Sequence, residues 1–325
     1  MKRLLGIVAL CVVGCHDQFS NEDLQFRYDG VPPQIEIVIP TENGPTGVGQ
    51  PGGPPPPGTA QFYGDARRIA DTVNQQIFSV LTWINVIAAL PPTIRMENQR
   101  VWGPLPGDDG VEYTLFTDRV DTSTVFRATA TSTPTFTETA FDFALIGRSA
   151  AAFDGRIVLS GRQVTESAGA QGVLVLNFDA AREVNPNDTQ QGTALLGYDT
   201  RHDQTTIELL LSAPALGPAA DAAWRHSQKS DGGGDFLFFK RENVDPTTSA
   251  LEQMIIAARW RADGQGRADV WVINGDLVVP LFASECWDAA FNPTYLLSNI
   301  PDPAYFPRGA LTDCAPDLRV PQFPP

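Results

Sequence analysis

The chain has 325 residues, of which 42% are hydrophobic and 9% aromatic, and this composition is ordinary for a globular protein that buries a large core. Its formal net charge of −15 comes from 38 acidic and 23 basic residues. Such an acidic surface repels phosphate backbones and anionic lipid headgroups, so we expect no nucleic-acid partner and no purely electrostatic attachment to a membrane.

The N-terminal segment has the pattern of a secretory signal. Lys2-Arg3 is followed by the apolar run from Leu4 to Val13, which is too short to span a membrane. The run ends in Val12-Val13-Gly14-Cys15, which resembles the lipobox of bacterial lipoproteins. That resemblance implies cleavage before Cys15 and lipidation of its sulfur. The alternative is an ordinary secretory signal that ends in a cysteine by chance.

Two neighbouring residues refine this interpretation. Cys11 is disfavoured as the lipidation site because the bulky Leu10 precedes it, where the lipobox has a small residue. His16 follows Cys15, whereas Asp at that position favours retention in the inner membrane of enteric bacteria. The resemblance therefore implies a lipid-anchored protein of the bacterial cell envelope, on the outer membrane rather than the inner one.

The segment after the predicted anchor lacks the composition of a core. Residues 40–58 contain 7 Pro and 6 Gly, and a Pro-rich stretch favours an extended polyproline conformation. Before it, we predict a short edge strand over Gln34 to Ile39. Residues 15–29 are polar and are predicted to form a loose segment. We therefore predict a signal peptide over residues 1–14, a tether over 15–58 and a single β-rich globular domain over 59–325.

One long helix is predicted over Asp65 to Leu90. Asp65 can cap its N-terminus, and Pro91-Pro92 ends it. Apolar residues recur every three or four positions along it, as on one face of a helix. The resulting stripe consists of Ile69, Val73, Ile77, Val80, Leu81, Ile84 and Ile87. Since such a helix must lie on something large, the stripe faces either a packed core or a ligand.

From about residue 100 the pattern changes to β. Eleven strands are predicted from short segments rich in Val, Thr, Phe and Leu between Gly and Asp turns. They are Val111–Phe116, Thr124–Ala130, Thr135–Leu145, Arg156–Gln163, Gly172–Phe178, Thr193–Tyr198, Thr205–Ser212, Asp235–Arg241, Met254–Ala262, Ala268–Ile273 and Leu277–Phe282. The predicted fold is mainly β: a long antiparallel meander that curls into an incomplete barrel, with the long N-terminal α-helix packed on its concave face. Ala213 to Lys229 is expected to be a short helix or a lid.

The C-terminal region contains the two cysteines that remain after the signal. Cys286 and Cys314 are expected to form a disulfide, because two thiols in an exported protein usually pair. The segment from Trp287 is rich in Pro and aromatic residues and is expected to wrap around the body as a tail.

Residues that could carry catalysis are sparse. The chain has three histidines, and we place His202 in a hairpin turn and His226 in a loop or lid. The sequence lacks the nucleophile, phosphate-loop and zinc-protease motifs. The acidic loop Asp263-Gly264-Gln265-Gly266 resembles calcium-binding repeats of the FG-GAP type, but it occurs once and reads as a hairpin turn. We expect no metal and no cofactor, and these residues favour a non-catalytic role over a hydrolase assembled in space.

Two hypotheses about function remain open. In outline, the predicted body resembles the LolA/LolB class of lipoprotein carriers, which implies a non-catalytic protein that binds an apolar ligand or lipid in its half-barrel. The alternative is a structural or interaction lipoprotein, with a filled core and a surface that docks another envelope protein. A cavity inside the sheet would distinguish these two classes.

Overall fold

The computed structural model describes residues 20–33, 35, 37–40, 58–107, 110–126, 135–149, 154–166, 168–188, 190–201, 203–212, 222–243 and 248–323. The predicted signal peptide with Cys15, most of the predicted tether and His202 lie outside the described residues. Within the described ranges, no helix has the length and apolar character needed to cross a membrane.

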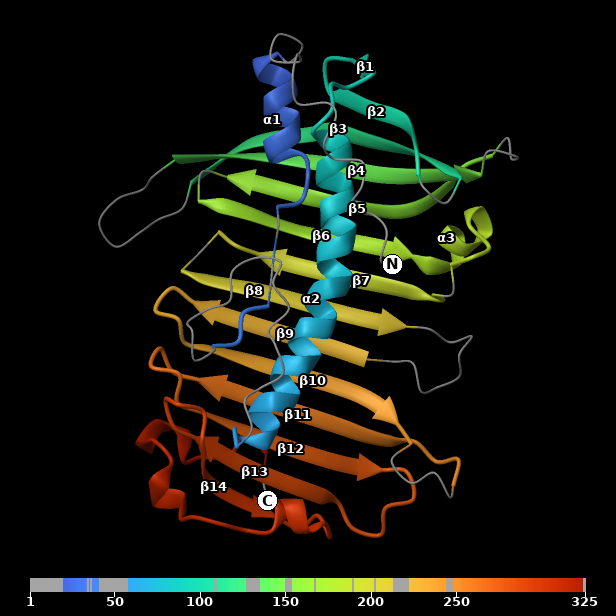
Figure 1. The fold of residues 1–325 in the computed structure, drawn as a ribbon. Helices are drawn as coiled ribbons and strands as arrows, with labels where there is room; N and C mark the ends of the chain where they lie inside the picture. Colours follow the sequence, from blue (N-terminus) through green and yellow to red (C-terminus); the bar gives the residue numbers. More distant parts are fainter. Residues whose placement is uncertain are drawn as a thin grey trace. The chain divides into compact units, whose positions relative to one another are not determined.

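The chain is mainly β, as predicted. Across the described residues, fourteen antiparallel strands form one sheet in which the strands are neighbours in chain order (Figure 1). The order has two ends, so the sheet is not closed. The strands are β1 (Ile94–Arg95), β2 (Gln99–Pro106), β3 (Val111–Phe126), β4 (Thr135–Ser149), β5 (Arg156–Glu166), β6 (Gly169–Asn177), β7 (Thr193–Asp199), β8 (Gln204–Ser212), β9 (Ala222–Lys229), β10 (Gly234–Glu242), β11 (Glu252–Trp260), β12 (Gly266–Asn274), β13 (Leu281–Trp287) and β14 (Pro293–Ser298).

Helices are fewer. The first helix, α1 (Asn21–Asp29), is short, and the 28-residue α2 (Gln61–Ala88) follows the segment predicted to be the tether. A third helix, α3 (Phe178–Val184), follows β6, and the 3-10 helices η3 (Pro303–Tyr305), η4 (Leu311–Asp313) and η5 (Pro316–Leu318) lie in the C-terminal tail.

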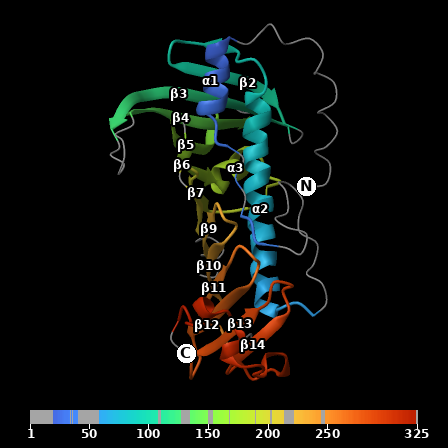
Figure 2. The same cartoon turned by 90° about the vertical axis from the view of Figure 1, so that its left-hand side faces the viewer.

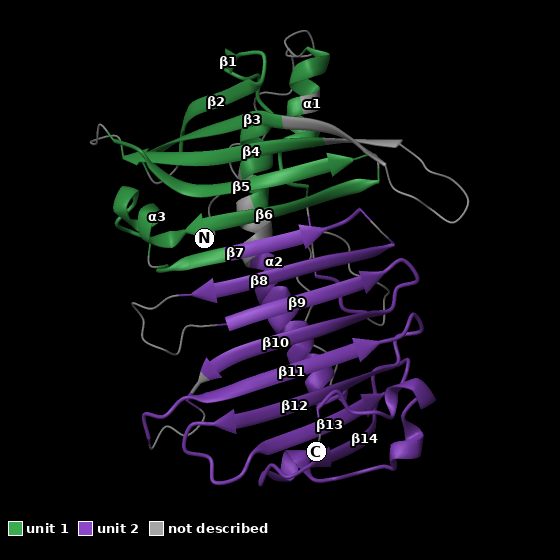
Figure 3. Cartoon of the chain, turned by 180° about the vertical axis from the view of Figure 1, so that it is seen from behind, with its two compact units in different colours: residues 1–34, 80–194 green, residues 35–79, 195–325 purple. Residues whose placement is uncertain are grey.

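The chain divides into two compact units, each made of an early and a later segment. Unit 1 comprises residues 1–34 and 80–194, and unit 2 comprises residues 35–79 and 195–325 (Figure 3). The last part of α2 therefore belongs to unit 1 and the first part to unit 2.

In unit 1, a buried carboxylate fixes α1 to the sheet. Ser20 and Asp23 form a reciprocal capping box at the start of the helix, with main-chain to side-chain hydrogen bonds of 3.0 and 3.1 Å. Asp23 also accepts hydrogen bonds from Nε of Arg95 (2.9 Å) and Nε of Arg100 (2.6 Å). The Arg100 guanidinium lies over the Phe26 ring at 4.4 Å. Figure 2 shows α1 and the end of α2 on the same side of β3–β6.

In unit 2, a segment inside the predicted tether packs between α2 and the sheet. Ile35, Ile37 and Ile39 are buried. Asn74 of α2 accepts a hydrogen bond from the Ile37 N–H and donates one to the Ile37 carbonyl, both at 2.7 Å, and the Val38 N–H donates to Nε2 of His226 in β9 (3.4 Å). Side chains therefore satisfy this backbone in place of a neighbouring strand.

Several predicted elements are corrected. Residues 21–29 are helical rather than loose, because Ser20 and Asp23 cap the helix. The described part of the predicted strand Gln34–Ile39 is not a strand, since Asn74 and His226 bind its backbone. The region expected to be a helix or lid over Ala213–Lys229 contains strand β9.

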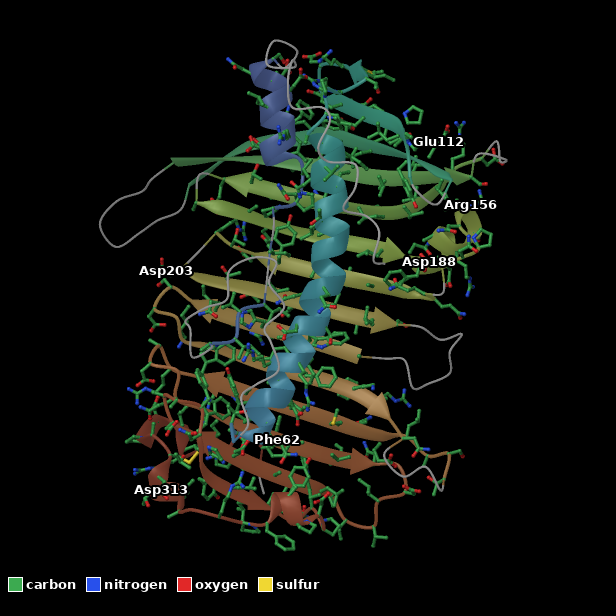
Figure 4. The ribbon with its side chains drawn as sticks, in the orientation of Figure 1. Phe62, Glu112, Arg156, Asp188, Asp203 and Asp313 are labelled. Carbon is green, nitrogen blue, oxygen red and sulfur yellow. A yellow bond between two sulfur atoms is a disulfide. The ribbon has the colours of Figure 1, made fainter. Side chains whose placement is uncertain are left out.

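The long helix was predicted, but it runs over Gln61–Ala88 rather than from Asp65 to Leu90, and its start differs most. The reason is a tertiary cap: the Phe62 N–H donates to the buried carboxylate of Glu285 in β13 (2.7 Å), so the first turn needs no capping residue at position 65. Figure 4 labels Phe62 at this end of α2.

Strand boundaries also differ. The first predicted strand and the described part of the second, residues 124–126, belong to one continuous strand, β3. The last predicted strand, Leu277–Phe282, starts too early, because Asn274 and Gly275 have positive φ and begin a turn that leaves Val278 97% exposed. Strands β1, β2 and β14 were not predicted.

Candidate functional site

One face of β12 and β13 in unit 2 presents a regular grid of side chains. Arg267, Asp269 and Trp271 occupy alternate positions of β12 and therefore point to the same face. Their directly paired residues in β13, which share that face, are Cys286, Ser284 and Phe282. The grid thus passes from an aromatic pair, through a polar pair, to an arginine beside the disulfide.

The predicted disulfide is present in this region. Cys286 and Cys314 are joined with a Cα–Cα distance of 5.6 Å, which is within the usual range for a disulfide. Cys314 follows η4, so the bond fixes the tail to the face of β13 that carries Ser284. Figure 4 shows the bond in yellow close to Asp313.

A buried polar network fastens the end of the tail to the same face. Arg267 donates to the carbonyls of Leu318 and Arg319, both at 2.9 Å, and to Oδ1 of Asp269 at 2.9 Å. Oδ2 of Asp269 accepts the N–H of Gln322 at 2.8 Å. Both charged side chains are buried, so their pairing and their contacts with the backbone of the tail are needed to offset desolvation.

Ser284 completes the network, and its hydrogen bonds do not activate its hydroxyl as a nucleophile. Its hydroxyl donates to Asp269 and accepts a hydrogen bond from Arg267. Donation from a guanidinium draws electron density away from the hydroxyl oxygen and opposes its use as a nucleophile. No histidine belongs to this hydrogen-bond network. The arrangement is therefore suited to holding the tail.

An apolar pocket of about 240 Å³ lies between this grid and the tail. We call it the tail pocket. Its apolar lining includes Trp271, Phe282, Leu297, Leu311, Pro321 and Phe323. Phe323 stacks on Trp271 with ring centroids 5.9 Å apart, so the end of the tail forms part of the wall. The volume is slightly below the range of roughly 300–1,000 Å³ for pockets that hold drug-sized molecules, and it suits a single hydrocarbon chain or ring.

The opposite face of β13 supports the start of α2. Glu285 is fully buried there and accepts the Phe62 N–H, while Nη2 of Arg308 lies 3.3 Å from its carboxylate. Burial raises the pKa of the Glu285 carboxyl, and the N–H groups of Phe62 and Gln61, together with Arg308, oppose that shift. The carboxylate acts as a structural cap for α2 and is not available to a ligand.

His226 is a buried strand residue rather than the loop residue expected from the sequence. It is 0% exposed in β9, and its ring stacks on Trp260 with centroids 5.8 Å apart. Burial lowers its pKa to about 4, although the main chain of Asp235 opposes the shift. The imidazole is therefore neutral at pH 7 and serves as the acceptor for Val38.

Four of the five described side chains of the helical stripe are buried. Val73, Leu81 and Ile84 are 0% exposed, Ile87 is 1% exposed, and Ile69 is partly exposed. The side chains of Ile77 and Val80 lie outside the described residues. Because a side chain with no accessible surface has no water-sized space beside it, these four residues pack in a core and do not line an open pocket.

The acidic loop after β11 is a tight turn. Oδ1 of Asp263 accepts the Gln265 N–H at 3.1 Å, and Gly264 has a positive φ of 87°. The described residues contain no group of three or more His, Cys, Asp or Glu side chains that could hold a metal ion.

The tail pocket was not predicted, because its residues are spread over positions 267–323 and meet only through strand register and the return of the tail. The clustering of aromatic residues and prolines in the last forty residues was the available signal. Comparison of the chain with models of known protein families, with curated proteins and with solved structures found no match.

Proposed function

We propose that this chain is a lipid-anchored protein of the bacterial cell envelope, outside the enzyme classes, that binds an apolar molecule in the tail pocket. The observation that supports the binding role best is the pocket itself, with its mainly apolar lining and about 240 Å³ of space. The polar groups beneath it are already hydrogen-bonded to one another and to the tail, so they favour no charged ligand.

The anchoring half of the proposal depends on Cys15. The lipobox-like sequence before it and the Pro/Gly-rich residues 40–58 after it suit a body held away from a membrane by a lipid and a spacer. The same proposal includes a sheet that curls around the long helix as an incomplete barrel. It also includes the resemblance in outline to the LolA/LolB carriers. The proposal includes no nucleic-acid partner, because the acidic surface repels the phosphate backbone.

Membrane fractionation of a bacterial host tests the anchor. Cys15→Ser should move the protein from the membrane fraction to the soluble fraction, because the acylated sulfur is lost. Cys11→Ser is the matched control and should leave the protein membrane-bound. A Cys15→Ser variant that is still processed and still sediments with membranes would show that the lipidation site was assigned wrongly.

Binding of a neutral fluorescent dye, N-phenyl-1-naphthylamine, tests the pocket. Leu297 lines the pocket and is 38% exposed, so Leu297→Asn should fold normally and weaken dye binding about tenfold by placing an amide in the apolar wall. Leu195→Asn is the matched control: Leu195 is a 42% exposed strand residue of unit 2 outside the pocket. Equal dye binding by the two variants would refute the pocket as the binding site.

The second candidate is a structural or interaction lipoprotein. It is favoured by the burial of Val73, Leu81, Ile84 and Ile87 of the α2 stripe, which leaves no water-sized space beside these four side chains. Native mass spectrometry of the delipidated protein from its own host separates the two candidates. A copurified apolar molecule that is absent from the Leu297→Asn variant supports the binding role, and a ligand-free protein that copurifies with another envelope protein supports the second.

A further inference from the structure

A row of apolar side chains begins at Trp271, which lines the tail pocket, and crosses the strands of unit 2. Trp271, at the pocket, pairs directly with Ile255 of β11, and Ile255 pairs with Phe239 of β10. Phe239 pairs with Ala223 of β9, which pairs with Leu210 of β8. Directly paired residues share a face, so these side chains form one line perpendicular to the strands, which we call the apolar row.

The apolar row lies on the face of the sheet opposite α2. The tail pocket and the row both use Trp271, whereas α2 contacts the other face through Glu285. Figure 3 views β8–β12 from the side of the row, with the unit 2 part of α2 behind them. At the far end of the row, Leu210 is 50% exposed, so the row is accessible there.

The length of the row matches an extended hydrocarbon chain. Neighbouring strands are about 4.8 Å apart, so the four steps from β12 to β8 span roughly 19 Å. One leaflet of a bilayer contributes about half of the roughly 30 Å hydrocarbon thickness, which is about 15 Å for one acyl chain. A chain whose end occupies the tail pocket can therefore lie along the row without leaving it.

The width of the row distinguishes a hydrocarbon chain from a broader partner. On one side, two positions along the strands, Arg241 pairs with Gln253. On the other side, a parallel line of directly paired residues lies two positions along the strands. It begins with the ion pair of Glu208 and Arg225 and ends at Asp269, with Leu237 and Ala257 between them. Polar groups thus border much of the row, whereas a protein interface or a membrane surface needs a wider apolar patch.

We infer that the apolar row and the tail pocket together bind the single acyl chain of an amphiphile, with the end of the chain in the pocket and its remainder along β11 to β8. This inference rests on the proposed binding function and deepens it by naming the ligand class. Its distinguishing consequence is that affinity increases with chain length beyond the length that fills the pocket.

Displacement of the naphthylamine dye by octanoate, dodecanoate and hexadecanoate, below their aggregation concentrations, tests this inference. Each fully buried methylene strengthens binding about fourfold, so on a half-open row hexadecanoate should bind at least about tenfold more tightly than dodecanoate. Leu210→Ser and Ile255→Ser should each remove most of that gain and leave octanoate binding unchanged. Leu237→Ser is the matched control, because Leu237 is on the same face, 38% exposed, and outside the row.

The outcomes separate the inference from the proposed function. A chain-length gain that is lost in Leu210→Ser and retained in Leu237→Ser supports the row. If the dye binds but hexadecanoate is no tighter than dodecanoate, the row is overturned and the pocket stands. If neither dye nor any fatty acid binds, both proposals fail. If Leu210→Ser converts a dimer to a monomer in sedimentation experiments, the row is covered by a second copy and the inference is overturned.

Discussion

Protonation of His226 should make unit 2 less stable in acid. Its imidazole is fully buried, and burial lowers its pKa from the ordinary 6.5 to about 4. Because the folded pKa lies below the unfolded one, the unfolded chain binds the proton more tightly. The contribution of neutral His226 to the free energy of unfolding is fully present above pH 6.5. It is lost as the pH falls towards 4, and it changes little below pH 4.

The magnitude follows from the difference between the two pKa values. A difference of about 2.5 units corresponds to about 3.4 kcal/mol when the pH is below both values. At pH 4.5 the folded site is still mostly neutral, and the expected loss relative to pH 7 is about 2.5 kcal/mol. Carboxylates also titrate in this range, so the contribution of His226 must be isolated with a variant.

Urea denaturation followed by tryptophan fluorescence at pH 7 and pH 4.5 provides the measurement. His226→Gln keeps an acceptor for the Val38 N–H but cannot be protonated, so its stability should fall by about 2.5 kcal/mol less than that of the native protein between the two pH values. His202→Gln, at the position predicted from the sequence to be a turn, is the control and should behave as the native protein. If His226→Gln and the native protein lose the same stability, the buried neutral histidine is not the cause.

Three further outcomes are expected. Asp23→Asn should cost about 3 kcal/mol in urea denaturation, because the buried Arg100 loses its buried carboxylate partner and keeps only the half-exposed Glu22; a cost below about 1 kcal/mol would show that α1 is held by other contacts. Reduction of the Cys286–Cys314 disulfide should cost roughly 3 kcal/mol and expose the tail to limited proteolysis, whereas an unchanged digestion pattern would mean that the Arg267 network suffices. Gly161→Ala should cost about 1–3 kcal/mol, since a Cβ there would lie 2.4 Å from the Phe143 ring, while Gly197→Ala, with open space around the Cβ, should be tolerated; equal thermal stabilities would contradict the packing.

The strand-rich body and the long helix were predictable because their signals are local. Alternating Val, Thr and Phe and a three-to-four apolar spacing depend only on neighbouring residues. Strand β9 was missed because its inward positions are Trp224, His226 and Gln228 rather than aliphatic residues, so the alternation was hidden. The start of α2 was missed because Glu285, more than two hundred residues away, provides its cap.

The candidate site depended even more on distant contacts. The sequence indicated the Cys286–Cys314 pair by elimination, but not which strand face the tail would cover. The pairing of Trp271 with Phe282 and the return of Phe323 onto Trp271 are set by strand register and by the buried Arg267 network. A short Ser20-to-Asp23 capping signal was present for α1 and was overlooked in a segment dominated by polar residues.

The way each unit combines early and late residues has a consequence for folding kinetics. Gln163 of unit 1 donates to the carbonyl of Asp29, and Glu285 of unit 2 binds the N–H of Phe62, across sequence separations of 134 and 223 residues. Contacts between residues so far apart in the sequence are slow to form, because a long loop must close before they stabilise the fold. Neither unit can be completed by the first half of the chain alone. Truncated forms that end before β5 lack Gln163 and should therefore remain unfolded, and unit 2 should acquire its native contacts only after nearly all of the chain is available.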